Sequence, residues 1–206
     1  MDMAVIRQAS WDVASALGCP TNDALPLLDA ISITRSEDEI VDRVFGMLCL
    51  AAAAYGLDQK RALEWLKREG RLEILTSEES GFLGDSQMNP APFMEQIEGM
   101  WTLCWSLKLI SDLDFSKPCS GDFVKLFPDL KKDESGVAFR EKTSLRDSYD
   151  VIAKCDLAYC LHWGIVHRGL TGKMQKLIRP YVIVERRRSL EWLLSDESWD
   201  EISLDT

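Results

Sequence analysis

The stretch that decides the fold runs from Ser36 to Gly56 and reads SEDEIVDRVFGMLCLAAAAYG. Its first residues form a capping box. The Ser36 side chain can accept a hydrogen bond from a free backbone amide, and the side chain of Glu39, three residues on, can reach back to the start of the helix. Behind this cap, apolar residues recur at helical spacing until Gly56, at positions Ile40, Val44, Met47, Leu48, Ala51 and Tyr55. The stretch therefore predicts a long helix that contributes to the hydrophobic core.

Helical signals also dominate on both sides of this stretch. Caps, apolar spacing and Gly or Pro stops predict helices over 5–17, 58–70, from Thr76 onward, 90–111, 145–170 and 180–194. No persuasive alternating strand pattern occurs. Residues 111–143 carry Pro118, Gly121, Pro128 and Gly136 among scattered charges, which predicts an irregular connecting segment. The expected fold is all-α: a single domain over 1–206, with about eight helices estimated from these patterns.

The composition indicates a globular protein with an acidic surface. The 206 residues are 46% hydrophobic and 28% charged, with a formal net charge of −10. A net negative chain repels phosphate backbones, so general nucleic-acid binding is not expected. The same charge suits another protein with a basic surface as partner. The sequence does not define an oligomeric state.

The sequence predicts a cytoplasmic location. Residues 1–8 lack a basic start followed by an apolar stretch, so no export signal is expected. The longest uncharged run, residues 44–57, is too short to span a membrane. None of the six cysteines forms a C-x-x-C pair, and four lie inside predicted helices beside apolar neighbours. This pattern is typical of buried thiols in a reduced compartment.

No motif of a metal, cofactor or nucleophile site is present. His162 and His167 are five residues apart, about 140° around a helix, so they cannot chelate one metal as an i, i+4 pair would. Neither a phosphate-binding glycine loop nor G-x-S-x-G occurs. We therefore expect no metal site and no cofactor.

Three charged residues interrupt apolar helix faces and are the candidates for chemistry. Glu98 lies among aromatic residues, Asp156 on the stripe of the 145–170 helix, and Arg186 between Ile183 and Leu190. One interpretation is a buried ion-pair network in which the two acids and the arginine pair and fix helix register. The other is a polar pocket in which Glu98 or Asp156 acts as a general base, with His162 joining the network around Asp156.

The end of the chain is electrically divided. The segment 173–188 is basic, through Lys173, Lys176, Arg179, Arg186, Arg187 and Arg188, whereas 191–205 carries acids and no base. The basic part could bind an anion or a phosphorylated ligand. The simpler interpretation is that the acidic tail folds back and neutralises it.

The closing residues carry a resemblance to a known family. ERRRSLEWL at 185–193, followed by WDEISLDT at 199–206, resembles E-R-x-x-(A/S)-L-x-W and W-D-x-x-x-D-T, the closing signature of domain of unknown function forty-two seventy-two. The resemblance implies a helical cytosolic domain and carries over no activity. It singles out the positions Glu98, Asp156, His162, Glu185, Arg186, Trp199, Asp200 and Asp205.

The resemblance also suggests a docked C-terminal tail over 199–206. In that arrangement Trp199 is a hydrophobic plug, and Asp200 or Asp205 lies near the arginines. Glu185, Arg186, Trp199, Asp200 and Asp205 are accordingly the candidates for ligand binding.

Two functions are compatible with these observations. The leading hypothesis is a non-enzymatic interaction or regulatory protein that masks a basic partner, by analogy with small inhibitor and immunity proteins. The alternative is an enzyme or small-molecule-binding protein that uses Glu98, Asp156, His162 and Arg186 around an interhelical pocket. An open cavity lined by these four side chains would favour the alternative.

Overall fold

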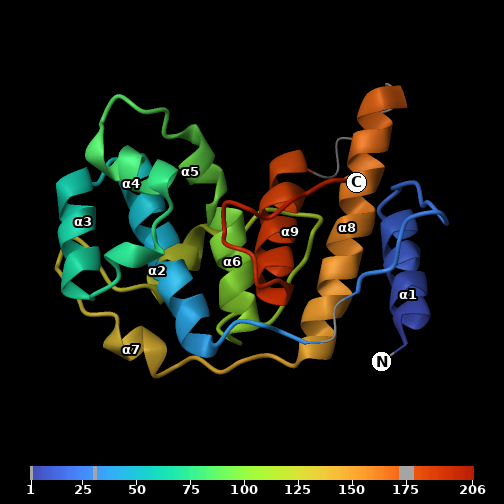
Figure 1. The fold of residues 1–206 in the computed structure, drawn as a ribbon, viewed down its shortest axis with the longest axis horizontal. Helices are drawn as coiled ribbons and strands as arrows, with labels where there is room; N and C mark the ends of the chain where they lie inside the picture. Colours follow the sequence, from blue (N-terminus) through green and yellow to red (C-terminus); the bar gives the residue numbers. More distant parts are fainter. Residues whose placement is uncertain (1, 30–31, 172–178) are drawn as a thin grey trace. The chain divides into compact units, whose positions relative to one another are not determined.

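The computed structural model describes residues 2–29, 32–171 and 179–206, and within them the fold is all-α, as expected. The described residues form nine α-helices and two short 3₁₀ helices, with no strand (Figure 1). They divide into two compact units. Unit 1 comprises 1–35, 112–118 and 146–206, and unit 2 comprises 36–111 and 119–145.

Unit 1 is built on a long helix, α8 (Ser148–Thr171), which packs against both α1 (Met3–Ala16) and α9 (Pro180–Leu194). Within this unit α8 lies between the other two helices, so α1 is covered by a helix on one side only (Figure 1). Arg35 links the chain before unit 2 to α9, donating to the carbonyl of Trp192 at 3.2 Å and lying 4.8 Å from its ring.

Unit 2 is organised around α2 (Glu37–Ala54), the helix predicted from the opening stretch. The Ser36 capping box is present with both reciprocal bonds, and so is the second box at Thr76 and Glu79. Around α2 pack α3 (Gln59–Arg68), α4 (Ser77–Gly84), α5 (Ala91–Glu95) and α6 (Ile97–Ser106). A 3₁₀ turn, η1 (Leu72–Ile74), joins α3 to α4.

One predicted helix is divided and shortened. Where the sequence indicates a single helix over 90–111, the structure has α5 and α6 separated by a turn at Gln96. α6 ends at Ser106 because Lys108 adopts a positive φ of 58°. The amides of Lys108 and Leu109 then bond back to Trp105 and Cys104, which closes the helix end.

The segment 111–143 contributes to both units. Residues 112–118 belong to unit 1, and the rest of it, with η2 (Gly121–Leu126) and α7 (Val137–Arg140), belongs to unit 2. In unit 2 its aromatic rings complete the core: Phe139 lies 5.4 Å from Phe45, and Phe123 lies 4.9 Å from Trp101. Buried aromatic side chains therefore fix a segment that has little regular secondary structure.

Candidate functional site

A buried ion pair in unit 1 joins Arg7 on α1 to Asp156 on α8. The Asp156 residue is 0% exposed and Arg7 is 3% exposed. The Arg7 Nε lies 3.1 Å from both carboxylate oxygens, and Nη2 lies 2.8 Å from Oδ1. The guanidinium also donates to the carbonyls of Leu25 and Pro26, at 2.7 and 2.8 Å. This single side chain thus connects α1, the loop that follows it and α8.

The expected pairing of Asp156 with Arg186 is wrong, because Asp156 pairs with Arg7. Sequence reasoning missed Arg7, although it interrupts the buried face of α1, where its neighbours are Ile6, Ser10 and Ala14. The criterion that singled out Asp156, a charge on an otherwise apolar helix face, would also have found Arg7. The partners are 149 residues apart in the chain, so only the packing of α1 on α8 could match them.

A second polar cluster surrounds Arg187 on α9. Its Nη1 lies 2.8 Å from Nδ1 of His162 on α8, and its Nε donates to Glu191 at 3.0 Å. The guanidinium carbon stands 4.6 Å from the centre of the Tyr159 ring. Burial and, to a smaller extent, the positive charge of Arg187 lower the pKa of His162 to about 4. His162 is therefore a neutral imidazole that accepts a hydrogen bond from Arg187 at pH 7.

The C-terminal residues contact this cluster. Arg187 donates to the backbone carbonyls of Leu204 and Asp205, both at 3.1 Å. Trp199 is buried, with its ring 5.7 Å from that of Trp192 in an edge-to-face arrangement. Asp200 is exposed and accepts a bond from Ser198 at 2.9 Å. Arg187 thus reaches the tail through backbone carbonyls and lies next to Asp205, while Trp199 fills an apolar site.

The basic segment before the tail is only partly described. Lys173 and Lys176 lie outside the described residues. Glu185 and Arg188 form an ion pair of 3.9 Å on α9, within one turn. Arg187 pairs with Glu191, the first acid of the acidic region. The Arg187–Glu191 pair thus neutralises charge between the two regions, across successive turns of α9.

Arg186 holds the segment 112–118 in unit 1. The residue is 1% exposed, and it donates to the carbonyl of Asp114 at 2.6 Å and to that of Lys117 at 3.1 Å. Its guanidinium lies 5.9 Å from the Phe115 ring. A cation with several fixed donors is suited to bind such an irregular segment, because the segment has few bonds of its own. Arg186 therefore positions the segment that forms one wall of a cavity.

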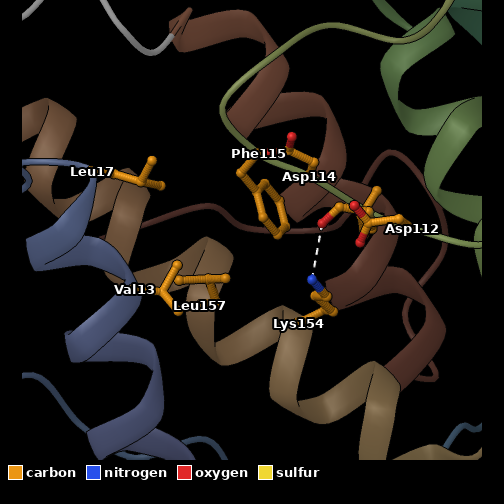
Figure 2. A pocket seen from close by; sticks show the side chains of 8 residues that line it. Val13, Leu17, Asp112, Asp114, Phe115, Lys154 and Leu157 are labelled. Carbon is orange, nitrogen blue, oxygen red and sulfur yellow. Dashed lines mark hydrogen bonds between the residues drawn. The ribbon is translucent and has the colours of Figure 1, made fainter.

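This cavity opens between α1, α8 and the segment 112–118 and has a volume of about 210 Å³. Figure 2 shows Val13 of α1 beside Leu157 of α8, with Leu17, which follows α1, and the Phe115 ring lining the same cavity. The polar part of the lining comes from Asp112, Asp114 and Lys154. Sequence patterns singled out none of these lining residues as site candidates. They form a cavity only because the two helices and the segment 112–118 pack together.

The charges at this cavity are unequally compensated. The Lys154 ammonium donates to the carbonyl of Leu113 at 3.0 Å (Figure 2). Asp114 accepts from Ser116 and pairs with Lys117 at 3.1 Å, and the bond from Ser116, with the nearby Lys117, lowers its pKa to about 2. Asp112 is exposed and makes no hydrogen bond or ion pair with any other residue in the described parts of the chain. One carboxylate at the cavity is thus available to a cation.

Glu98 belongs to unit 2 and has a different environment. It is 1% exposed, and its Oε1 accepts from the backbone amide of Cys119 at 2.9 Å. Its own carbonyl accepts from the Thr102 hydroxyl at 3.1 Å. Glu98 therefore fixes the start of the loop that leads to η2. Asp156, His162 and Arg186 lie in unit 1, and none of the four candidates lines the cavity described above.

Unit 2 holds a further buried ion pair that sequence reasoning missed. Arg43 on α2 binds the Glu79 carboxylate through both terminal nitrogens, with Nη1 at 2.9 Å from Oε2. Glu79 was recognised as half of a capping box, and it still accepts from the Thr76 amide at 3.0 Å. The same carboxylate therefore caps α4 and attaches it to α2.

The described cysteines are free thiols, and five of them are buried. Burial raises the pKa of the Cys160 thiol to about 12, and burial also raises the pKa of Cys49, Cys104 and Cys155. Thiols in such surroundings are poor nucleophiles. The described residues contain no group of three or more His, Cys, Asp or Glu poised for a metal ion. They also contain no helix long and apolar enough to cross a bilayer.

These helices and buried polar contacts define an all-α protein whose charged core residues connect its elements. Residues 6–202 match the domain of unknown function family DUF4272, so the chain belongs to that family. The match covers nearly the whole chain and includes both polar clusters of unit 1. Comparison with curated proteins and with solved structures gave no match.

Proposed function

We propose that this protein is a non-enzymatic binding protein that recognises a basic, amphipathic helix of a partner through the outer face of α1. The observation that carries the proposal is an apolar stripe on that face. Val5, Ala9 and Val13 recur every four residues and are exposed, and Leu17 continues the stripe. Val5 is 60% exposed and Val13 is 43% exposed. Residues four apart share one side of a helix.

The adjacent face of α1 is already occupied. Its buried residues, Ile6, Arg7, Ser10 and Ala14, pack toward α8. Val5 and Ala9 are thus left exposed by the packing of unit 1, while Val13 and Leu17 reach the cavity beside α8. Apolar side chains at such spacing on a helix surface are the anchors through which one amphipathic helix binds another. Contiguous exposed apolar positions on a soluble protein commonly mark an interaction site.

Charge supports a basic partner. The chain carries a formal charge of −10, while the seven residues of charged type that are buried in the described parts of the chain sum formally to +1. The remaining side chains therefore carry about −11, and a partner of opposite sign is favoured in both encounter rate and specificity.

Burial of the candidate polar residues favours this function over the enzymatic alternative. Glu98, Asp156 and Arg186 are each at most 1% exposed and are engaged with backbone or side-chain partners. A catalytic group must reach a substrate, and these side chains instead stabilise loops and helix contacts.

The test compares two valines of equal exposure. A fluorescent 20-residue helical peptide of Leu and Lys is titrated with the wild-type protein, Val5→Asp and Val124→Asp, and binding is followed by anisotropy. Val124 is 61% exposed but lies in η2 of unit 2. We expect Val5→Asp to weaken binding about tenfold, corresponding to about 1.4 kcal/mol of apolar contact, and Val124→Asp to leave it unchanged.

The sign of the effect separates this proposal from general charge attraction. Each substitution adds one negative charge, so attraction alone would make both variants bind the basic peptide slightly more tightly. Equal affinity for a scrambled peptide of the same composition would refute the proposal. A stable dimer of the protein that Val5→Asp dissociates would also refute it, because the stripe would then contact a second copy.

A further inference from the structure

The cavity of unit 1 lies at the C-terminal end of the α1 stripe. Val13 and Leu17 belong to both, since they continue the stripe and also line the cavity. A helix bound along the stripe would therefore bring one of its side chains to the opening. The volume of about 210 Å³ is below the roughly 300–1,000 Å³ of most small-molecule sites, which suits one long side chain.

The lining matches the two ends of a lysine. The walls formed by Leu17, Leu157 and Phe115 are apolar and suit a methylene stem (Figure 2). Asp112 offers a carboxylate to the ammonium group. Long cationic side chains bind in this manner, with the stem on apolar surface and the charge at a polar edge.

Of the two carboxylates that line the cavity, Asp112 is the one without a partner among the residues that the structure describes, because Asp114 is compensated by Lys117. Lys154 keeps its positive charge and is bonded to the carbonyl of Leu113. Arg186 donates to the carbonyls of Asp114 and Lys117 and so fixes the wall. The backbone of the segment that carries Asp112 is therefore held by a buried arginine before any ligand arrives, which reduces the entropic cost of binding.

We propose that this cavity is the anchor site for a lysine side chain of the basic partner, with Asp112 as the acceptor of its ammonium group. The inference rests on the proposed function, because it assigns a specific contact to the same interface. It also makes a prediction about the cavity that does not need the partner: a free alkylammonium ion should bind there weakly.

The first experiment uses hexylammonium chloride as the probe and ¹³C-methyl NMR as the readout. We expect its titration to shift the methyl signals of Val13, Leu17 and Leu157. Asp112→Asn should weaken this binding at least fivefold, while the matched control Asp196→Asn should not change it. Asp196 is exposed in the same unit and does not line the cavity. Hexanoate that binds as well as hexylammonium, or an Asp112→Asn variant that binds normally, would overturn the proposal.

The second experiment separates this proposal from the proposed function. Each lysine of the Leu–Lys peptide is replaced in turn by norleucine, and each peptide is titrated with the wild type and with Asp112→Asn. We expect one position at which the norleucine peptide loses affinity for the wild type about fivefold but not for Asp112→Asn. Binding that depends on Val5 without any such position would overturn the lysine anchor and leave the proposed function intact. Binding of hexylammonium without any binding of the peptide would overturn both, and would assign the cavity to free amines.

Discussion

Replacing Arg7 with Met removes the cation that compensates a fully buried carboxylate. Three contacts of 2.8 to 3.1 Å to Asp156 are lost, together with the donors to Leu25 and Pro26. Removing one partner of a buried pair costs about 3–5 kcal/mol, because the other charge stays buried without compensation. Since a domain of this kind has about 5–15 kcal/mol of stability, the loss is large.

The assay is equilibrium urea unfolding at pH 7, followed by circular dichroism and by tryptophan fluorescence. We expect Arg7→Met to lower the free energy of unfolding by about 4 kcal/mol. Arg68→Met is the matched control, since Arg68 contacts Asp133 in a pair whose side chains are 46% and 49% exposed. Exposed pairs contribute about 0–1 kcal/mol, so the control should remain near the wild type.

A double substitution decides whether the cost comes from the uncompensated charge. Arg7→Met with Asp156→Leu removes both charges and leaves apolar side chains in their place. We expect the double variant to be more stable than either single variant, because two apolar groups can replace a buried ion pair at little cost. Additive losses, or a cost of Arg7→Met below about 1 kcal/mol, would refute the reasoning.

Two further predictions concern the C-terminal part of unit 1. The pKa of His162 is about 4 in the folded protein and about 6.5 in an unfolded chain, so the unfolded chain binds the extra proton between these values. The wild type should therefore lose about 1–2 kcal/mol as the pH falls from 6.5 to 4, after allowance for partial exposure, and His162→Gln should lack this component in melting curves. Trp199→Ala should lower the free energy of unfolding by about 3 kcal/mol, because it empties the site against Trp192, whereas Asp200→Ala should change it by less than about 0.5 kcal/mol. An unchanged melting temperature for Trp199→Ala would show that the tail contributes nothing to stability.

Much of the secondary structure could be predicted because its signals are local. The capping boxes at Ser36 and Thr76 and the proline at the start of α9 each act within one helical turn, and the structure has all three. The end of α6 could not be predicted, because the positive φ of Lys108 is compatible with many sequences. The apolar residues that follow Ser106 continue a helical pattern while the backbone itself turns away.

In the candidate site, too, local features could be predicted from the sequence and long-range contacts could not. Local pattern identified Asp156, Glu98 and Arg186 as charges on apolar faces, and all three are buried. The sequence did not supply the partner of Asp156 or the backbone carbonyls that Arg186 binds. Asp156 pairs with Arg7 across 149 residues, and Arg186 binds backbone carbonyls, which have no signature in the side-chain sequence. Such partners can be assigned only when the packing of helices is known.

The sequence by itself determined the all-α class, the family and the acidic balance of charge, because each depends on composition or on residues close together in the chain. The tertiary structure alone decided where the charged residues find their partners, and it formed the cavity at Asp112. That cavity combines residues from 13–17, 112–115 and 154–157, which become neighbours only when α1 packs on α8 and Arg186 fixes the loop between them. Spatial proximity of distant residues comes from packing, and local sequence patterns do not encode it.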